Sequence, residues 1–447
     1  MFSLILIAYV AALIVLSLKL TDKASSRSAA RFLTANATAG ALLCALSLVS
    51  TIIGGSATLG MGSLAQKTGA AAFWWLGVGS LGLFIHARFI VPKIRALGAC
   101  TLPDVLGRVV GRRAKRWSAL IIVLSWVGVV AAQFTALRTL LTDILPGLEG
   151  EIFFLLVAGA VIVHTALGGQ KAVIRTDALQ TLLLAGGFTL AGLWCVSRAP
   201  AFEATELIPF NETFGLFDWI KLLLLVGITY VIGPDMFSRT FAARSTPDAQ
   251  KGAVLAGVLL LFFGAAITFL ALNNLSAANP ISGWLTQVSP MPALIRIALA
   301  LGLVGALAGS ADTVLLSATG IVERDILEGD RSSRMRWLIA LFGTGSVILA
   351  YESADIIGWL LYAYALFVPG VAVPLLVVLL SKNARCHEPI WLAGAVTGGF
   401  LGLAGNLTGA PLALLGIVLA AAATLLALAR TSATATKKAL RNTAEEP

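Results

Sequence analysis

The chain has 447 residues, of which 58% are hydrophobic and 12% charged, with a mean hydropathy of +0.92 and a formal net charge of +10. A soluble domain carries about 25–35% charged residues on its surface, so this composition excludes a soluble globular protein and predicts an integral membrane protein. The basic residues are dispersed in short loops, which argues against a nucleic-acid partner. The four cysteines show no CxxC spacing, so neither a metal site nor a disulfide framework is indicated.

Apolar runs long enough to cross a bilayer as helices recur along the whole chain. They predict an all-α polytopic membrane protein with thirteen transmembrane helices, at about 2–20, 40–64, 70–92, 116–140, 150–168, 172–196, 217–236, 252–273, 295–322, 335–352, 355–381, 390–406 and 411–430. The first run lacks a preceding basic region and a small-residue cleavage pattern, so we expect it to be an uncleaved span.

The distribution of Lys and Arg predicts the orientation of these helices. With the N-terminus outside, all but five of the 32 Lys and Arg fall in inward loops or at the adjoining helix ends; the five are Lys67, Arg138, Arg198, Lys221 and Arg296. Because inward loops carry the excess of basic residues, we predict an outside N-terminus and a cytoplasmic C-terminus. The expected location is the plasma membrane, which in a bacterium is the inner membrane.

Two of the predicted spans are interrupted where a helix would have to run. Glycines occur at 54, 55, 60 and 62 within the first, and Gly233 and Pro234 adjoin in the second, about 180 residues later. Non-helical backbone at membrane depth is tolerated where it lines a cavity or is buried in protein, and transporters with inverted repeats bind solutes at such interruptions. The sequence therefore predicts a solute carrier.

Each interrupted span opens a run of five spans, which predicts two inverted repeats. The expected divisions are an N-terminal helix and loop at 1–39, a first repeat with core helices 1–5 at 40–196, a second repeat with core helices 6–10 at 197–381, two C-terminal helices at 382–430 and a cytoplasmic tail at 431–447.

A polar stripe is predicted inside the span at 295–322. Ala306, Gly309, Ser310 and Thr313 recur at helical spacing, with Asp312 at the edge of the stripe. An unpartnered carboxylate inside a bilayer costs about 2.5–3.5 kcal/mol, and oxygen groups suit a hard cation. The alternative is that small and polar residues merely allow close helix packing; Asp312 favours the functional interpretation.

Other charged residues have structural alternatives. Asp177 taken alone predicts an interfacial ion pair with Arg175 or Lys171, and Asp235 equally predicts a pair with Arg239 on the cytoplasmic side. The three histidines are too scattered for a ligand set. No HExxH, GxSxG, GxxxxGK[ST] or CxxC motif occurs, so we expect no enzyme, and coupling to an ion gradient in place of nucleotide hydrolysis.

From about Arg31 to Arg385 the chain resembles the sodium/solute symporter family. The resemblance rests on ARFLTA, on GMGSLAQKTG, on LGGQKAVIRTDALQ, and on the pair GPDMFSRTFAAR and GSADTVLLSATGIVERDIL, in that order. It implies a five-plus-five inverted repeat with a discontinuous first helix in each half.

The resemblance implies Na⁺ as the coupling ion, held where the first and eighth core helices meet. The residues that match the family's sodium ligands are Ser50, Ile53, Ala306, Gly309 and Ser310. Gly309 stands where a hydroxyl residue is usual, which removes one oxygen ligand. A second cation site in some members corresponds to Asp177, Asp312 and Thr313.

The resemblance also implies a substrate pocket beside the interruptions. The residues expected there are Gly54, Ala57, Met61, Trp75, Tyr230, Trp359 and Tyr362. Where sugar-transporting members carry polar groups, this chain has Ala57, Leu76 and Gly79, so a sugar would leave hydroxyls unpaired. We therefore expect sodium-coupled symport of an amino acid or carboxylate by a monomer in the lipid bilayer.

Three alternatives to sodium symport remain at this point. Asp312 or Asp177 predicts a proton-coupled symporter whose uptake follows pH. A membrane sensor domain would need a signalling partner, and a channel would show flux without saturation.

Overall fold

The computed structural model describes residues 2–20, 28–198, 209–352, 355–381, 386–409 and 412–444. Within these ranges the chain is helical and forms no β-strand. The first ten helices are α1 (Phe2–Leu20), α2 (Ala29–Thr34), α3 (Ala41–Ile52), α4 (Met61–Thr68), α5 (Trp74–Ile85), α6 (Val91–Ala96), α7 (Leu102–Val109), α8 (Arg112–Ile144), α9 (Leu148–Ser197) and α10 (Leu216–Leu222). They are followed by α11 (Ile228–Val231), α12 (Pro234–Ala242), α13 (Thr246–Leu272), α14 (Ala293–Ile321), α15 (Ser332–Leu349), α16 (Ile356–Phe367), α17 (Val373–Leu380), α18 (Glu388–Thr408) and α19 (Leu412–Ala444).

Several helices begin at residues that are suited to cap them. Ser245 precedes α13 and its hydroxyl accepts a hydrogen bond from the Asp248 N–H at 3.1 Å. Thr101 caps α7 in the same way through the Asp104 N–H at 3.1 Å. Both helices also have a proline in the first turn, where the missing N–H costs nothing because that group has no partner within the helix. These caps fix the ends of helices that lead into the bundle.

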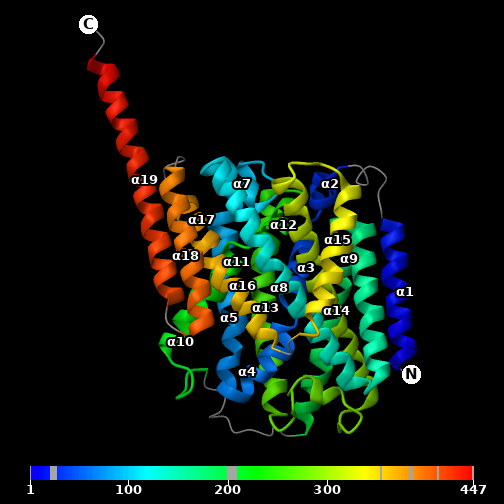
Figure 1. Ribbon diagram of the computed structural model, residues 1–447. Helices are drawn as coiled ribbons and strands as arrows, with labels where there is room; N and C mark the ends of the chain where they lie inside the picture. Colours follow the sequence, from blue (N-terminus) through cyan, green and yellow to red (C-terminus); the bar gives the residue numbers. More distant parts are fainter. Residues whose placement is uncertain are drawn as a thin grey trace.

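The helices form one bundle with an apolar exterior. Helix α1 lies at one side and α18 and α19 at the other, with α3, α8 and α14 between them (Figure 1). Large apolar side chains face outward, including Leu124 and Leu341, each 67% exposed, and Trp337, 78% exposed. A continuous exposed apolar surface of this kind fits lipid and would be unfavourable in water. The chain is therefore a multi-pass membrane protein.

Helix α9 reverses direction at Gly169. Its 50 residues include Gly169 at φ 57° and ψ −163°, which is not a helical conformation. The side chains of His164 and Thr176 are joined by a hydrogen bond of 3.2 Å between Nε2 and Oγ1, although twelve residues would span about 18 Å along a straight helix. Phe32 also packs against the Gly169 α-carbon so closely that a β-carbon there would collide with its ring. The two halves of α9 therefore lie side by side.

The number of spans differs from the sequence prediction. Ten helical runs in the described ranges are long and apolar enough to cross a membrane, against the thirteen that we expected. The run Ser56–Ala96 and helix α9 each include parts of two expected spans, whereas Ala41–Ile52 is too short to qualify alone. The all-α membrane fold is confirmed; the count of thirteen, the repeat layout and the domain boundaries stay predictions.

Both predicted interruptions occur. Helix α3 ends at Ile52, and a π-helical segment, Ser56–Gly60, follows Gly54 and Gly55. Helix α11 ends at Val231, and α12 starts at Pro234 after Gly233 in extended conformation. Proline has no N–H to continue the helical ladder, which explains the second interruption. We call residues 53–55 the first break and residues 232–233 the second break.

Candidate functional site

The first break frees backbone carbonyls at the end of α3. In a continuous helix the N–H groups of Gly54 and Gly55 would bond to the carbonyls of Ser50 and Thr51. Instead, the Gly54 N–H bonds to Ile52 O at 2.9 Å, and the Gly55 N–H bonds to Gln133 Oε1 at 2.7 Å. The carbonyls of Ser50 and Thr51 are thereby released from the α3 ladder.

The released end of α3 meets the middle of α14, and we call this contact the α3–α14 junction. Ser310 Oγ on α14 donates to Thr51 O at 2.8 Å. The backbone of Gly309 comes so close that a β-carbon there would lie within 3.0 Å of Ser50 Oγ. The structure thus brings Ser50, Gly309 and Ser310 together, with Ile53 at the first break and Ala306 buried one turn earlier on α14.

Asp177 and Arg239 form a buried ion pair next to this junction. Arg239 Nη2 lies 2.9 Å from Asp177 Oδ2, and their side chains are 1% and 0% exposed. The same guanidinium donates to Ser47 Oγ at 2.9 Å and to Thr313 Oγ1. The alternatives that paired Asp177 with Arg175 or Lys171, and Arg239 with Asp235, are therefore wrong. Because α9 turns at Gly169, Asp177 lies deep in the bundle and not at the interface.

Asp312 faces a histidine. Its Oδ2 lies 3.6 Å from His164 Nε2, and both side chains are 1% exposed. The other carboxylate oxygen accepts from Thr313 Oγ1 at 3.3 Å. The three residues expected at a second cation site, Asp177, Asp312 and Thr313, are thus near one another, but Arg239 and His164 take part in the same network.

No group of three His, Cys, Asp or Glu that would hold a metal ion occurs among the described residues.

A narrow cavity of about 40 Å³ lies between the two breaks. This volume admits only a few water molecules. Its lining is formed by Thr51, Ile52, Ser56, Trp126, Val129, Gln133, Thr229, Tyr230, Gly233, Asp235, Met236, Ser310, Val314, Leu360 and Tyr364. The cavity therefore lies beside the first break and reaches both the second break, through Gly233, and Ser310. Any organic solute held there requires the surrounding helices to move apart.

Residues 32–319 match the sequence model of the sodium:solute symporter family. The chain belongs to the sodium:solute symporter family.

One curated relative and two solved structures are similar to this chain at low sequence identity. A sodium/glucose cotransporter of Vibrio parahaemolyticus is 24% identical over 336 residues, which are 64% of this chain and 61% of that protein. The chain thus spans about three fifths of the length of this curated relative. A solved structure of a Na⁺-coupled sialic acid symporter, substrate-bound and outward-open, matches with a TM-score of 0.78 and 16% identity over 95% of this chain and 96% of that one. A nucleobase-cation-symport-1 family transporter matches with a TM-score of 0.48 and 12% identity over 92% and 94%. The sialic acid symporter and this chain share a fold.

Only one of the seven residues expected at the substrate pocket lines the cavity between the breaks. That residue is Tyr230. Gly54 does not line the cavity and lies against the side chains of Gln133 and Ser310. Ala57 and Met61 are fully buried, and Trp75 is 3% exposed. Trp359 packs beside Gly128, and Tyr362 is 42% exposed on the outside of the bundle. None of these six residues lines the cavity in this conformation. Their place in the substrate pocket stays a prediction.

Gln133, Trp126 and Asp235 are among the lining residues that the sequence analysis did not assign to the site. Gln133 holds the first break open through the Gly55 N–H. Trp126 Nε1 donates to Asp235 Oδ2 at 2.9 Å, and Asp235 Oδ1 has no hydrogen-bond partner in the described structure. Gln133 is a polar residue in the middle of an apolar span, and this is the signal that could have identified it.

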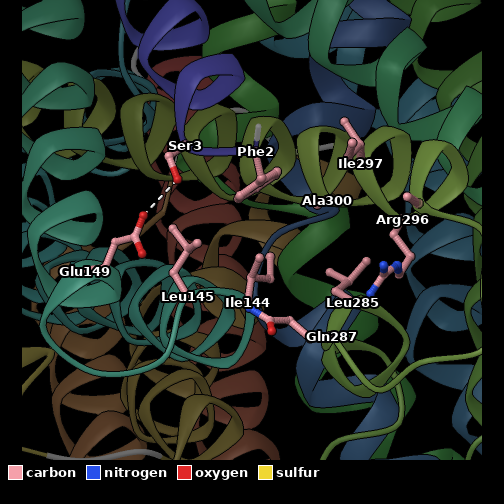
Figure 2. Close-up of a pocket in the computed structure, with 11 residues that line it drawn as sticks. Phe2, Ser3, Ile144, Leu145, Glu149, Leu285, Gln287, Arg296, Ile297 and Ala300 are labelled. Carbon is pink, nitrogen blue, oxygen red and sulfur yellow. Dashed lines mark hydrogen bonds between the residues drawn. The ribbon is translucent and has the colours of Figure 1, made fainter.

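A larger cavity lies elsewhere in the structure. It measures about 300 Å³ and is lined at one end of α1, α8 and α14 by residues that include Phe2, Leu145 and Ile297 (Figure 2). Ser3 Oγ donates to Glu149 at 2.8 Å across its rim. None of its lining residues belongs to either break, so size alone does not identify the binding site.

Proposed function

We propose that this chain is a secondary active transporter that couples the downhill entry of Na⁺ to the uptake of a small organic solute. The observation that carries the proposal is the α3–α14 junction, where the first break frees the carbonyl of Ser50 and sets the Ser310 hydroxyl against the end of α3. Hard cations bind such carbonyl and hydroxyl oxygens. Family membership supports Na⁺ as the ion.

The proposed junction site uses oxygens from two helices. Ser50 and Ile53 supply carbonyls from the end of α3, while Ala306 and Gly309 supply carbonyls and Ser310 a hydroxyl from α14. A hydroxyl that donates to Thr51 still has two lone pairs with which to bind a cation. Binding would therefore tie the two helices together without breaking the hydrogen bond that already joins them.

The energy available from one Na⁺ is sufficient for concentrative uptake. A membrane potential of 100 mV contributes about 2.3 kcal/mol per charge, and a tenfold sodium gradient contributes about 1.4 kcal/mol. Since 1.4 kcal/mol corresponds to a factor of ten, the two together support roughly a few hundredfold accumulation at one-to-one coupling.

The solute that we propose is an amino acid, in preference to a simple carboxylate or a sugar. Asp235 lies at the cavity with one carboxylate oxygen fixed by Trp126 and the other without a partner. An ammonium group would satisfy that oxygen, because a buried carboxylate without a partner is costly. The backbone at the start of α12, which follows the second break, provides N–H groups and a positive dipole end for the solute carboxylate.

Asp235→Asn is therefore expected to raise KM for an amino-acid solute about tenfold to hundredfold, since a hydrogen bond to a charged group is worth about 1.5–3 kcal/mol. Sodium dependence should change little. The measurement is concentration-dependent uptake into proteoliposomes. Asp143→Asn is a matched control, because Asp143 accepts from Ser282 and does not line the cavity between the breaks. An unchanged KM in Asp235→Asn would remove Asp235 from the solute site.

The proposed architecture has thirteen spans, with two five-helix repeats, an outside N-terminus and a cytoplasmic C-terminus in the plasma membrane. Polar contacts close the predicted cytoplasmic end: Lys115 Nζ lies 3.1 Å from Asp325, and Asp330 accepts from Ser28 Oγ at 2.9 Å. Alternating access requires these contacts to separate as the cavity opens inward. The cation would favour the conformation in which the junction is formed.

Proton coupling is the second candidate, and the Asp312 and His164 pair favours it. Two titratable groups buried 3.6 Å apart hold or release one proton together. A proton-coupled carrier would accumulate solute in response to an inward pH gradient without sodium. Sodium coupling predicts no accumulation under that condition.

The proposal is tested by uptake of labelled amino acids, monocarboxylates and sugars into proteoliposomes, with and without an inward sodium gradient. We expect sodium to stimulate uptake of at least one amino acid. Ser310→Ala should raise the sodium concentration for half-maximal uptake about tenfold, because it removes one oxygen ligand worth about 1.4 kcal/mol. An unaltered sodium dependence in Ser310→Ala would exclude Ser310 from the ion site.

A further inference from the structure

The larger cavity at one end of the bundle contains two charged groups that do not pair. It measures about 300 Å³, at the small end of the range for small-molecule sites, about 300–1,000 Å³. Arg296 from α14 and Glu149 from the start of α9 both line it, and Figure 2 shows them at opposite sides. Glu151 pairs with Arg138 at 2.6 Å, whereas neither Glu149 nor Arg296 forms an ion pair within the described ranges. The cavity therefore offers separate positions for an anion and a cation.

The guanidinium of Arg296 is held in place and still has a free donor. Its Nη1 donates to Thr286 O at 2.5 Å, and its buried Nε has no hydrogen-bond partner in the described structure. A buried donor without a partner is costly, and an acceptor inside the cavity would satisfy it. Phosphate oxygens suit a guanidinium, because they accept two parallel hydrogen bonds from it. Arg296 is therefore suited to bind a phosphate group.

The carboxylate of Glu149 is exposed and only partly occupied. One of its oxygens, Oε1, accepts from Ser3 Oγ at 2.8 Å (Figure 2), and no other hydrogen bond to this carboxylate occurs among the described residues. An ammonium group has three N–H donors and no acceptor, so it complements a carboxylate with a free oxygen. The cavity thus combines a group that suits phosphate with a group that suits ammonium.

Strongly exposed apolar side chains adjoin the lining of this cavity. Four lining residues each have a large apolar neighbour in sequence that is mostly exposed: Leu4 (71%), Leu148 (76%), Val288 (93%) and Leu294 (78%). The cavity lies at the periphery, because α1, which supplies Phe2 to the lining, is the outermost helix on its side of the bundle (Figure 1). Such apolar surface is unfavourable in water and suits acyl chains. The surroundings therefore fit an amphipathic occupant.

We propose that this cavity binds the headgroup of a phospholipid that carries an ammonium group, such as phosphatidylethanolamine, and we call it the headgroup site. The phosphate would lie at Arg296 and the ammonium at Glu149, while the acyl chains would pack against the exposed apolar side chains. A free amino acid also has an anionic and a cationic group, but no part of it would cover those side chains. With the N-terminus outside, the lipid would come from the outer leaflet. The headgroup site requires neither sodium nor solute, so it is independent of the proposed function.

The test is native mass spectrometry of the purified full-length protein in detergent, titrated with phosphatidylethanolamine or with phosphatidylglycerol of the same acyl chains. We expect one phosphatidylethanolamine to bind each wild-type chain at least about tenfold more tightly than phosphatidylglycerol, which has no ammonium group. Glu149→Gln should abolish this preference without weakening the binding of phosphatidylglycerol. Arg296→Gln should weaken the binding of both lipids about tenfold or more, because both carry the phosphate.

Arg198→Gln is the matched control for Arg296→Gln. Arg198 is also a basic residue that the predicted orientation places outside, but it does not line the cavity. Its substitution should leave both lipid affinities unchanged. Thermal unfolding in detergent checks the fold of each variant. If Arg296→Gln does not fold, the headgroup preference of Glu149→Gln still decides the matter, because that substitution changes an exposed side chain.

An unchanged preference for phosphatidylethanolamine in Glu149→Gln would overturn the headgroup site. So would equal losses of affinity in Arg198→Gln and Arg296→Gln, because these would reflect surface charge alone. The water-soluble glycerophosphoethanolamine should bind at least about hundredfold more weakly than the lipid, since it lacks acyl chains; equally tight binding would show that the occupant is not a lipid. Sodium and solute are absent from these titrations, so their outcome leaves the proposed α3–α14 junction site untouched.

Discussion

Arg239→Ala is expected to destabilise the protein by about 3–5 kcal/mol, which is typical when one partner of a buried ion pair is removed. The substitution would leave the carboxylate of Asp177 buried with no cation, and it would also remove donors to Ser47 and Thr313. Thermal and denaturant unfolding in detergent measures the effect, and sodium-driven uptake should be lost.

Two comparisons make this prediction specific to the buried pair. Arg244→Ala removes a pair of the same kind, Arg244 Nε to Asp248 at 2.8 Å, but the Arg244 side chain is 66% exposed, so the free energy of unfolding should change little. The double variant Arg239→Ala and Asp177→Asn should recover part of the lost stability, because the neutral amide no longer needs a cation. Equal effects of Arg239→Ala and Arg244→Ala would contradict the buried pair.

Gly54→Ala is expected to lower sodium-driven uptake about tenfold to hundredfold. A β-carbon on Gly54 would lie within 3.0 Å of Gln133 Oε1 and of Ser310 Oγ. Overpacking of this kind costs about 1–3 kcal/mol, and here the strain falls on the two side chains that hold the first break and the junction. The half-saturating sodium concentration should therefore rise together with the loss of rate.

Gly159→Ala on α9 is the control for Gly54→Ala. A β-carbon at Gly159 meets no atom within 4 Å, and alanine favours the helix over glycine by about 1 kcal/mol. Gly159→Ala should transport as well as the wild type. If Gly54→Ala kept normal uptake and normal sodium dependence, the close approach of the first break to Ser310 would not be needed for transport.

The breaks were predictable because their signals are local. Gly54 and Gly55 within an apolar span, and Pro234 after Gly233, interrupt a helix whatever the rest of the fold does. The polar stripe on α14 was likewise visible as helical spacing around Ser310 and Asp312. These features located the α3–α14 junction from sequence, and family resemblance named the residues of the two helices that meet there.

The partners within the buried network were not predictable, because they depend on long-range packing. Arg239 and Asp177 are 62 residues apart, and no spacing rule joins them. The sequence favoured nearer partners for Asp177, since it does not show that the turn at Gly169 carries this residue inward. Gln133 and Gln180 gave a weak signal as amides within apolar spans, but the points that they face became evident only in the folded bundle.

The span count shows a related limit. Hydropathy separates residues 150–168 from 172–196, whereas the structure joins them in α9 with a tight reversal at Gly169. Hydropathy reports that both segments are apolar enough for lipid. It does not report where a continuous helical hydrogen-bond pattern ends, so a count from apolar runs and a count from helices need not agree.

The most direct test of a cation at the α3–α14 junction is simultaneous measurement of ²²Na⁺ and labelled amino-acid entry into the same proteoliposomes. The account predicts that each flux requires the other, at a fixed ratio, and that Ser310→Ala shifts both to higher sodium concentration together. Amino-acid accumulation that proceeds equally well without sodium would contradict it.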